Sequence, residues 1–147
     1  MKLSGIRYGQ RKQTREKDDD LIIEIINWMR TEYNIKAKRK WYLLFDKQTH
    51  KLENFCETVT EEEARYYLTL NPDICWYDTH DHKCHVIEID GNKKTGGPHG
   101  PDKEGANKKT RDRNELYETA GINLVVLNFG NLEKGMTPTE FLEELLF

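Results

Sequence analysis

The chain has 147 residues, a hydrophobic fraction of 36% and a formal net charge of −3. This length suits one domain with its own core, and the slightly acidic balance excludes a protein that coats nucleic acid by charge alone. Three cysteines form no disulfide framework, so we expect a reducing cytoplasmic or intracellular compartment. No apolar run approaches the roughly 20 residues that span a bilayer, and the N-terminus lacks the apolar stretch of a signal peptide, so no membrane partner is expected.

The N-terminal stretch is strongly basic. Residues 2–17 contain six lysines or arginines and one glutamate. This composition fits either a solvated, flexible arm or an arm that contacts phosphate, and Arg11 and Lys12 are its candidates for nucleic-acid contact. The basic residues of the arm are Lys2, Arg7, Arg11, Lys12, Arg15 and Lys17.

A helix is predicted from Leu21 to Tyr33, where apolar residues recur at helical spacing. The acidic run Asp18–Asp20 precedes it and suits the positive end of the helix dipole. Glu24 falls on the polar side of this helix. We interpret it as a solvated residue rather than a contribution from the first helix to an active site.

Two short strands and a second helix are predicted next. Residues 41–45 are apolar and aromatic, and residues 52–56 return after a polar turn. Thr60 and Glu63 have the spacing of a capping box, which predicts the start of a helix. Pro72 cannot continue that helix, so we expect the helix to end before it.

Two runs at the centre of the chain predict a β-hairpin. Residues 71–78 and 83–90 are rich in aromatic or β-branched side chains, and the four residues between them are polar. If the turn is centred on residues 80–81, Asp78 lies opposite Lys83. The same register then assigns a partner to each of the remaining positions of the two runs.

Three carboxylates fall on one face of this hairpin. The register sets Asp73 opposite Glu88, and opposed residues share a face with Cβ atoms roughly 4.5–5.5 Å apart. Asp90 lies two residues after Glu88 and so shares that face. The hairpin is therefore predicted to gather three acidic groups at one end of an otherwise apolar ribbon.

The next stretch, residues 91–105, is rich in glycine and proline and predicts no regular element. A loop of this length inside a compact domain is usually functional or disordered. It contains His99 and matches neither the P-loop nor the dinucleotide-binding glycine pattern. A helix is predicted over residues 108–119, ended by Gly121 in a left-handed conformation.

The C-terminal part predicts a strand and a helix. Residues 122–128 are apolar enough for a buried central strand. Thr137 followed by Pro138, with Glu140 at the third helical position, predicts the start of the last helix. The residues expected to dock this helix are Phe141, Leu142, Leu145 and Leu146.

Three acidic groups on one face repel one another, and a divalent cation bound through oxygen is the usual compensation. Mg²⁺ or Mn²⁺ in such a site polarises a phosphate and generates hydroxide from bound water. Residues 93–113 hold seven basic residues against three acidic ones, which would neutralise a nucleic-acid backbone. These basic residues are Lys93, Lys94, Lys103, Lys108, Lys109, Arg111 and Arg113.

A family resemblance emerges from these residues. Pro72-Asp73, followed by Glu88-Ile89-Asp90 on the second hairpin strand, resembles the PD-(D/E)xK superfamily of restriction-endonuclease-like nucleases. The run 86–91, the loop with His99, Arg111-Asp112-Arg113 and the strand after Gly121 are similar to its very-short-patch-repair endonuclease branch. The likeness covers roughly residues 71–146.

The resemblance implies a single α/β (α+β) domain over residues 1–147, with an αβββαβ core and a central mixed sheet flanked by helices. It implies Asp73 and Glu88 as metal ligands. Asp90 occupies the position that a lysine normally holds in this superfamily. That lysine orients the attacking water. Asp90 is then either a third ligand or a sign that a lysine comes from elsewhere. Candidates for that lysine are Lys93, Lys94 and Lys109, and His99 is a candidate general base.

The expected activity is therefore metal-dependent hydrolysis of phosphodiester bonds in DNA, with RNA not excluded and a homodimer left open. A small standalone nuclease would fit a viral or mobile-element source. Because the motif lysine is absent, a nuclease-like fold that only binds nucleic acid is an alternative. Independently of the activity, Arg111 and Arg113 have a simpler interpretation as partners of Glu115 and Glu118 along their helix.

A zinc-binding interaction protein is the other alternative. His80, His82, Cys84 and His85 cluster near the hairpin tip, and Cys75 lies on the opposite strand. Successive strand residues point to opposite faces, so Cys84 and His85 cannot easily share one ion. The spacing also lacks the paired pattern of structural zinc sites.

Overall fold

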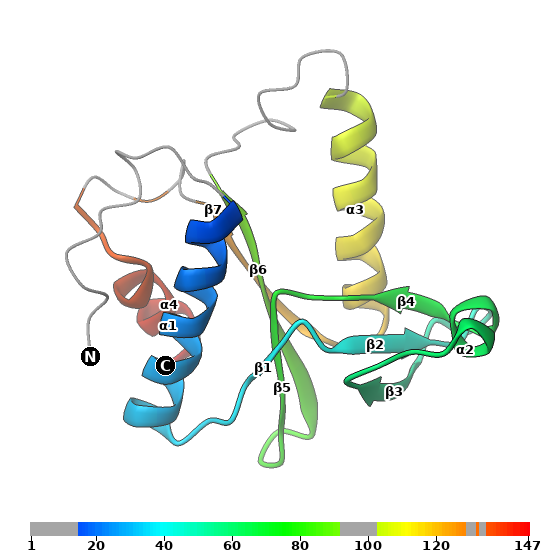
Figure 1. Ribbon diagram of the computed structural model, residues 1–147, viewed down its shortest axis with the longest axis horizontal. Helices are drawn as coiled ribbons and strands as arrows, with labels where there is room; N and C mark the ends of the chain where they lie inside the picture. The colour runs from blue at the N-terminus through cyan, green and yellow to red at the C-terminus, as the bar shows by residue number, and fades with distance from the viewer. Residues whose placement is uncertain (1–14, 92–102, 129–131, 133–134) are drawn as a thin grey trace.

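The computed structural model describes residues 15–91, 103–128, 132 and 135–147 (Figure 1). Within these ranges the chain is a mixed α+β fold, as predicted, and it contains no helix long and apolar enough to cross a membrane. The elements in chain order are α1 (Arg15–Tyr33), β1 (Lys38–Arg39), β2 (Tyr42–Phe45), β3 (Leu52–Cys56), α2 (Glu61–Tyr66), β4 (Leu68–Leu70), β5 (Ile74–Asp78), β6 (Lys83–Gly91), α3 (Lys103–Thr119), β7 (Asn123–Asn128) and α4 (Pro138–Leu146).

The larger sheet is mixed and has the strand order β1-β5-β6-β7. Strand β5 runs antiparallel to β1 and to β6, whereas β7 pairs with β6 in parallel. Parallel neighbours need a crossover connection, and α3 provides it between β6 and β7. Strand β6 is therefore central, with a paired neighbour on each side.

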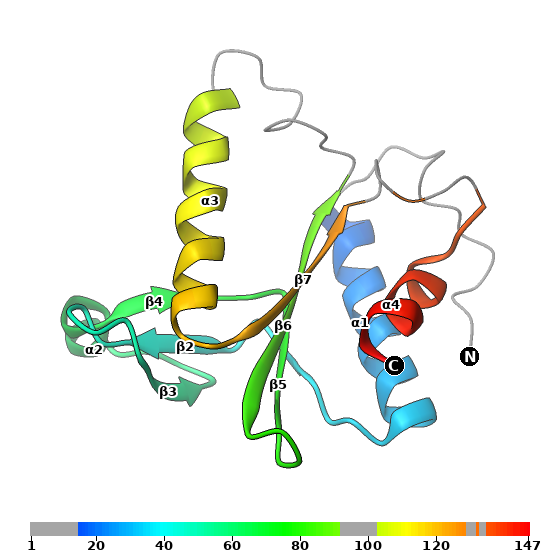
Figure 2. The ribbon, with the colours of Figure 1, turned by 180° about the vertical axis from the view of Figure 1, so that it is seen from behind.

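Helices cover both faces of this sheet (Figures 1 and 2). Helices α1 and α4 pack on one face, against a core that includes Ile74, Trp76 and Ile87. Helix α3 packs on the other face, where Val86 and Tyr117 belong to a second core. The alternation of side chains along β5 and β6 thus divides the interior into two cores.

The hairpin register is the predicted one. Asp78 pairs with Lys83, and at the other end Ile74 pairs with Ile87. Asp73 directly precedes β5, so the same register continued by one residue sets Asp73 against Glu88.

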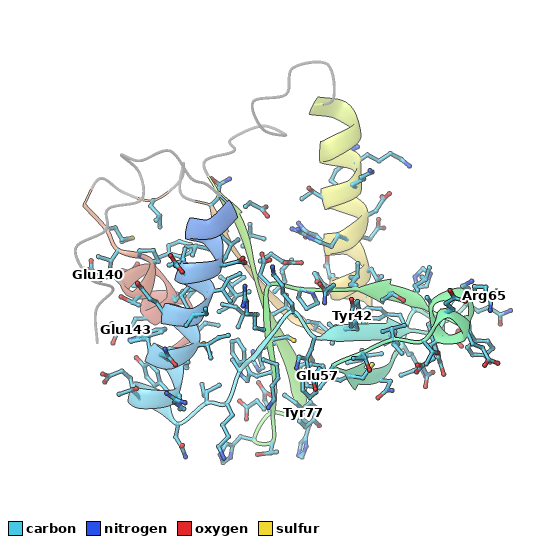
Figure 3. The ribbon with its side chains drawn as sticks, in the orientation of Figure 1. Tyr42, Glu57, Arg65, Tyr77, Glu140 and Glu143 are labelled. Carbon is cyan, nitrogen blue, oxygen red and sulfur yellow. The ribbon has the colours of Figure 1, made fainter. Side chains whose placement is uncertain are left out.

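A smaller sheet with the order β3-β2-β4 is inserted, together with α2, between β1 and β5. It extends to one side of the larger sheet, where Figure 3 labels Tyr42 and Arg65, while Glu140 and Glu143 of α4 lie on the opposite side. Fully buried apolar residues of β2 join the same core as α3, so the two sheets share a hydrophobic core.

The helix ends follow the predicted chemistry. Thr60 and Glu63 form both bonds of the capping box, each at 3.1 Å between the backbone nitrogen and the side-chain oxygen. Thr137 Oγ1 accepts a hydrogen bond from the Glu140 N–H at 3.2 Å. Gly121 ends α3 with a φ of 75°, which suits a residue without a Cβ atom.

Two helices begin earlier than predicted. Helix α1 begins at Arg15, so the acidic run lies inside it; Asp19 there pairs with Arg39 at 2.8 Å and with Lys40 at 3.1 Å, which offsets its charge. Helix α3 begins at Lys103 rather than at residue 108. It includes Gly105, whose cost of roughly 1 kcal/mol in a helix is small beside the packing of the whole element.

Helix α2 ends at Tyr66, before Pro72 as expected, and residues 68–70 then pair with β2 as the strand β4, which was not predicted. Two other expectations are wrong. Strand β7 is an edge strand of the described sheet, since it pairs with β6 alone, and most of its residues are half-buried. Leu142 of α4 is fully buried and Phe141 and Leu146 pack against the same core, but Leu145 is 57% exposed and does not dock the helix.

Candidate functional site

The Asp73 and Glu88 side chains interlock across the start of the hairpin. The Asp73 N–H donates to Glu88 Oε1 at 3.2 Å, and the Ile89 N–H donates to Asp73 Oδ2 at 2.8 Å. Each carboxylate therefore accepts a backbone hydrogen bond from the opposite segment. Glu88 is 6% exposed and Asp73 is half-buried, so the pair is held in place and Glu88 is largely removed from water.

Helix α3 adds two polar groups to this pair. Tyr117 donates its hydroxyl to Glu88 Oε2 at 2.8 Å, and Arg113 Nε lies 3.6 Å from the same oxygen. Arg113 and Tyr117 are four residues apart, so they lie on the same face of the helix. The helix thus presents one donor and one positive charge to Glu88.

Asp90 lies beside the pair but faces Arg113. Pairing between β6 and β7 shifts register between Ile89 and Gly91, which places Asp90 in a bulge. Its Oδ1 is 3.7 Å from Arg113 Nη1. Bulges re-aim side chains at the ends of strands, and this one leaves Asp90 on the same side as Glu88.

Burial and mutual repulsion perturb the two central carboxyl groups. Burial, reinforced by the Asp73 charge, raises the pKa of Glu88 to about 7 despite the opposing effect of Arg113. Burial and the Asp90 charge also raise the pKa of Asp73. The protein therefore holds negative charge here at a cost that a cation would relieve.

The donor set fits a hard cation, because every candidate ligand is a carboxylate oxygen. Asp73 Oδ1 takes part in neither of the backbone bonds above. Among the described residues, however, Asp73, Glu88 and Asp90 do not bring one oxygen each within 4.8 Å of one another. The geometry thus presents an interlocked pair with Asp90 set apart by Arg113, rather than three converged ligands.

The other predicted site residues fall into three groups. Lys108, Lys109 and Arg111 are exposed on α3, and Lys108 Nζ lies 3.7 Å from Asp112 Oδ2. Arg113, predicted as a nucleic-acid contact or a helix-surface partner, lies beside Glu88 and Asp90. The residues that lie outside the described ranges are Arg11, Lys12, Lys93, Lys94 and His99.

Glu24 differs from its prediction. It is half-buried on α1, and its Oε2 is enclosed without a hydrogen-bond partner among the described residues. Burial raises its pKa, with a further contribution from the Asp20 charge. The interpretation of Glu24 as a fully solvated residue is therefore wrong.

The structure separates the residues of the predicted zinc alternative. Cys84 belongs to the core under α3, whereas His85 stacks on Trp76 with ring centres 5.1 Å apart. Burial raises the pKa of Cys75 to about 12 and that of Cys84 to about 11, which disfavours the thiolate that zinc requires. Cys84 and His85 thus face different sides of the sheet, as expected from strand geometry.

His85 instead groups with two aspartates at the hairpin tip. Its Nε2 lies 2.8 Å from Asp81 Oδ2 and 4.0 Å from Asp78 Oδ2, and Asn123 Nδ2 lies 3.4 Å from its Nδ1. These residues border an open cavity of about 620 Å³. Sequence reasoning did not group Asp78 and Asp81 with His85, although a tight turn brings positions 78 to 85 together.

Tyr117 is the other residue that sequence reasoning missed. Its spacing of four from Arg113 was a usable signal that both lie on one helix face. The face of the sheet that they meet depends on how α3 packs across the core, which no local pattern specifies.

Comparison of the chain with protein-family models, with curated proteins and with solved structures finds no match. Its function is therefore inferred from the geometry and chemistry of the site.

Proposed function

We propose that the protein is a nuclease that hydrolyses phosphodiester bonds, with DNA as its substrate and Mg²⁺ or Mn²⁺ as its cofactor. The observation that carries this proposal is the interlocked pair of half-buried Asp73 and buried Glu88, both with raised pKa values. Two carboxyl groups that resist ionisation gain most from a bound cation, because the cation restores the charged form.

The chain's own residues would hold and orient such a cation. Asp73 and Glu88 provide oxygen ligands whose orientation is fixed by backbone donors, and Tyr117 fixes the second oxygen of Glu88. A bound Mg²⁺ supplies Lewis-acid activation of water and of the phosphate. Mg²⁺ sites commonly use one or two carboxylates and complete the shell with water and substrate phosphate, so the pair suffices.

The arrangement of elements supports the proposal. Helix α1, strands β1, β5 and β6, helix α3 and strand β7 follow the order expected for an αβββαβ nuclease core, with the smaller sheet as an insertion. The carboxylate pair lies where β5 begins and towards the end of β6, as the resemblance implies for metal ligands.

The charge on α3 also supports it. Lys108, Lys109 and Arg111 are exposed along the helix that carries Arg113 into the site. Positive side chains on one helix can bind successive phosphates and bring a backbone to the carboxylates.

The test is a cleavage assay on linear and supercoiled DNA, and on RNA, with Mg²⁺, Mn²⁺ or EDTA. We expect cutting of DNA with either metal, none with EDTA, and a fall of at least roughly 10²-fold in rate for Glu88→Gln. Glu115→Gln is the matched control, because Glu115 is exposed on α3.

Cleavage that survives both EDTA and Glu88→Gln would contradict the proposal. If the protein binds DNA tightly but cleaves it under none of these conditions, the alternative of a nuclease-like fold that only binds nucleic acid is favoured. The aspartate at the position of the motif lysine is the feature that suggests this alternative.

A further inference from the structure

Arg113 reaches from α3 into the space between two of the carboxylates. Its Nε lies 3.6 Å from Glu88 Oε2 and its Nη1 lies 3.7 Å from Asp90 Oδ1. Charge-assisted hydrogen bonds between arginine and a carboxylate are usually about 2.7–2.9 Å long. The guanidinium therefore neutralises both acids by proximity and is not locked to either in a bidentate pair.

The third nitrogen of Arg113 has an unused bonding capacity. Nε donates to Asn114 Oδ1 at 3.0 Å, but Nη2 is buried with no hydrogen-bond partner among the described residues. A buried charged donor without an acceptor is costly and rare, and it commonly marks a missing ligand or ion. The acceptor that best suits a planar guanidinium beside a nuclease site is a phosphate oxygen.

We propose that Arg113 takes the place of a cation beside Glu88 in the metal-free protein and contacts the scissile phosphate when a divalent cation binds Asp73 and Glu88. It thereby supplies the positive charge that the motif lysine supplies in the nuclease superfamily that the chain resembles. This inference rests on the proposed nuclease function and assigns the residue that completes the same site.

Charge balance gives the order of these contacts. Asp73, Glu88 and Asp90 carry three negative charges when ionised, and Arg113 offsets one. A divalent cation bound by the carboxylates repels the guanidinium, because like charges at this range oppose each other. A phosphate bound to the cation then provides Nη2 with the acceptor that it lacks.

Lys40 is the main rival for this role among the described residues. Its charge lowers the pKa of Asp73, but its Nζ is held by Asp19 at 3.1 Å. Among the described residues, Arg113 has no ion pair with an acid outside the site. Lys40→Gln is therefore the variant that separates the two assignments.

The first measurement is calorimetric titration of Mn²⁺ into the full chain without DNA. If Arg113 holds the cation position, Arg113→Gln should bind Mn²⁺ roughly ten-fold more tightly than the wild type, because one opposing charge is removed at short range. Glu88→Gln should lose this binding. A weaker Mn²⁺ affinity in Arg113→Gln would overturn the proposal.

The second measurement is the single-turnover rate of DNA cleavage at saturating Mn²⁺. Arg113→Gln should fall by roughly 10²-fold or more, whereas Lys40→Gln should stay within about three-fold of the wild type. A purely structural role would not raise metal affinity while lowering the rate. A wild-type rate in Arg113→Gln, or a loss confined to Lys40→Gln, would overturn the proposal.

Arg113→Lys keeps the test decisive if Arg113→Gln does not fold. Lysine retains the positive charge but lacks the planar, forked donors of the guanidinium, so the Mn²⁺ affinity should stay close to that of the wild type while the cleavage rate falls. An unchanged cleavage rate would overturn the proposal. A wild type that neither binds Mn²⁺ nor cleaves would contradict the nuclease function itself. If the wild type cleaves DNA and Arg113→Gln is equally active, only the role of Arg113 is contradicted.

Discussion

Glu88 shows how the surroundings of one residue set its chemistry. Burial raises its pKa from 4.5 to about 7, so in the metal-free protein the folded state binds its proton more tightly than the unfolded state does. A carboxyl group whose pKa is raised in the folded state contributes to the free energy of unfolding. This contribution is fully present below the pKa of the unfolded state and is lost as the pH rises through the pKa of the folded state. The raised pKa of Asp73 acts in the same direction.

We therefore predict that the metal-free protein loses stability between about pH 5 and pH 8, by roughly 1–3 kcal/mol from Glu88. Glu88→Gln should remove most of this loss and be more stable than the wild type at pH 8. Urea unfolding in EDTA across this pH range measures both, with Glu115→Gln as control. A wild type whose stability rises with pH over this range would show that Glu88 is not held as described.

The candidate site was partly predictable at this scale. The opposition of Asp73 and Glu88 followed from the hairpin register, because a short polar turn determines which residues pair. The bulge at Asp90 did not follow, since it depends on pairing with β7, more than thirty residues later in the chain. Arg113 was predicted to touch nucleic acid, and its contact with Glu88 depends on the rotation of α3 over the sheet.

At the scale of elements, local chemistry predicted where two of the helices begin. The capping box of α2 and the Thr137 cap of α4 are both formed. Strand β4 was not predicted, because it forms by pairing with β2, a contact between residues distant in the chain. The bounds of the elements in the smaller sheet thus depend more on strand pairing than on local helix preference.

Thr60→Ala should remove a donor–acceptor pair at the start of α2. We expect a loss of about 1 kcal/mol in the free energy of unfolding, measured with urea, because a lost N-cap leaves a backbone N–H without its partner. Thr58→Ala, at an exposed position outside the helix, is the matched control. DNA cleavage should be unchanged in both, and a large loss of activity in Thr60→Ala alone would tie the smaller sheet to catalysis.

Helix α3 carries the predicted contact with the DNA backbone. Replacing Lys109 or Arg111 by alanine should weaken binding similarly for all DNA sequences and reduce the slope of log affinity against log salt by about 1 for each residue. Lys51→Ala is the control, because Lys51 is exposed in the turn between β2 and β3. Fluorescence anisotropy at several salt concentrations gives the slopes. Slopes equal to that of the wild type would exclude this face from the interface.

At the scale of the whole molecule, the two cores explain why the site lies where it does. The core under α1 and α4 is apolar, and the aromatic rings of Trp28, Tyr33 and Phe147 lie close together where these helices meet. The other core is bordered by Glu88, Tyr117 and Arg113, so the polar groups gather on the α3 side of the sheet. Tyr77, labelled at the opposite end of the hairpin in Figure 3, is exposed and far along the strand from this site.

The fold class was predictable because the periodicity of most elements is clear in the sequence. The position of β7 was not, because an apolar run suits both a central strand and an edge strand that is covered on its faces by helices. The division into a larger sheet with an inserted smaller sheet depends on pairing between residues far apart in the chain. Such pairing leaves little local signal.

The central claim is that Asp73 and Glu88 together hold a catalytic divalent cation. Its most direct test is the rate of DNA cleavage as a function of Mn²⁺ concentration for the wild type, Asp73→Asn and Glu88→Gln. We predict a saturating dependence on Mn²⁺ for the wild type and no measurable dependence for either variant, with both variants folded by circular dichroism. Cleavage by both variants with the rate and Mn²⁺ dependence of the wild type would contradict the claim.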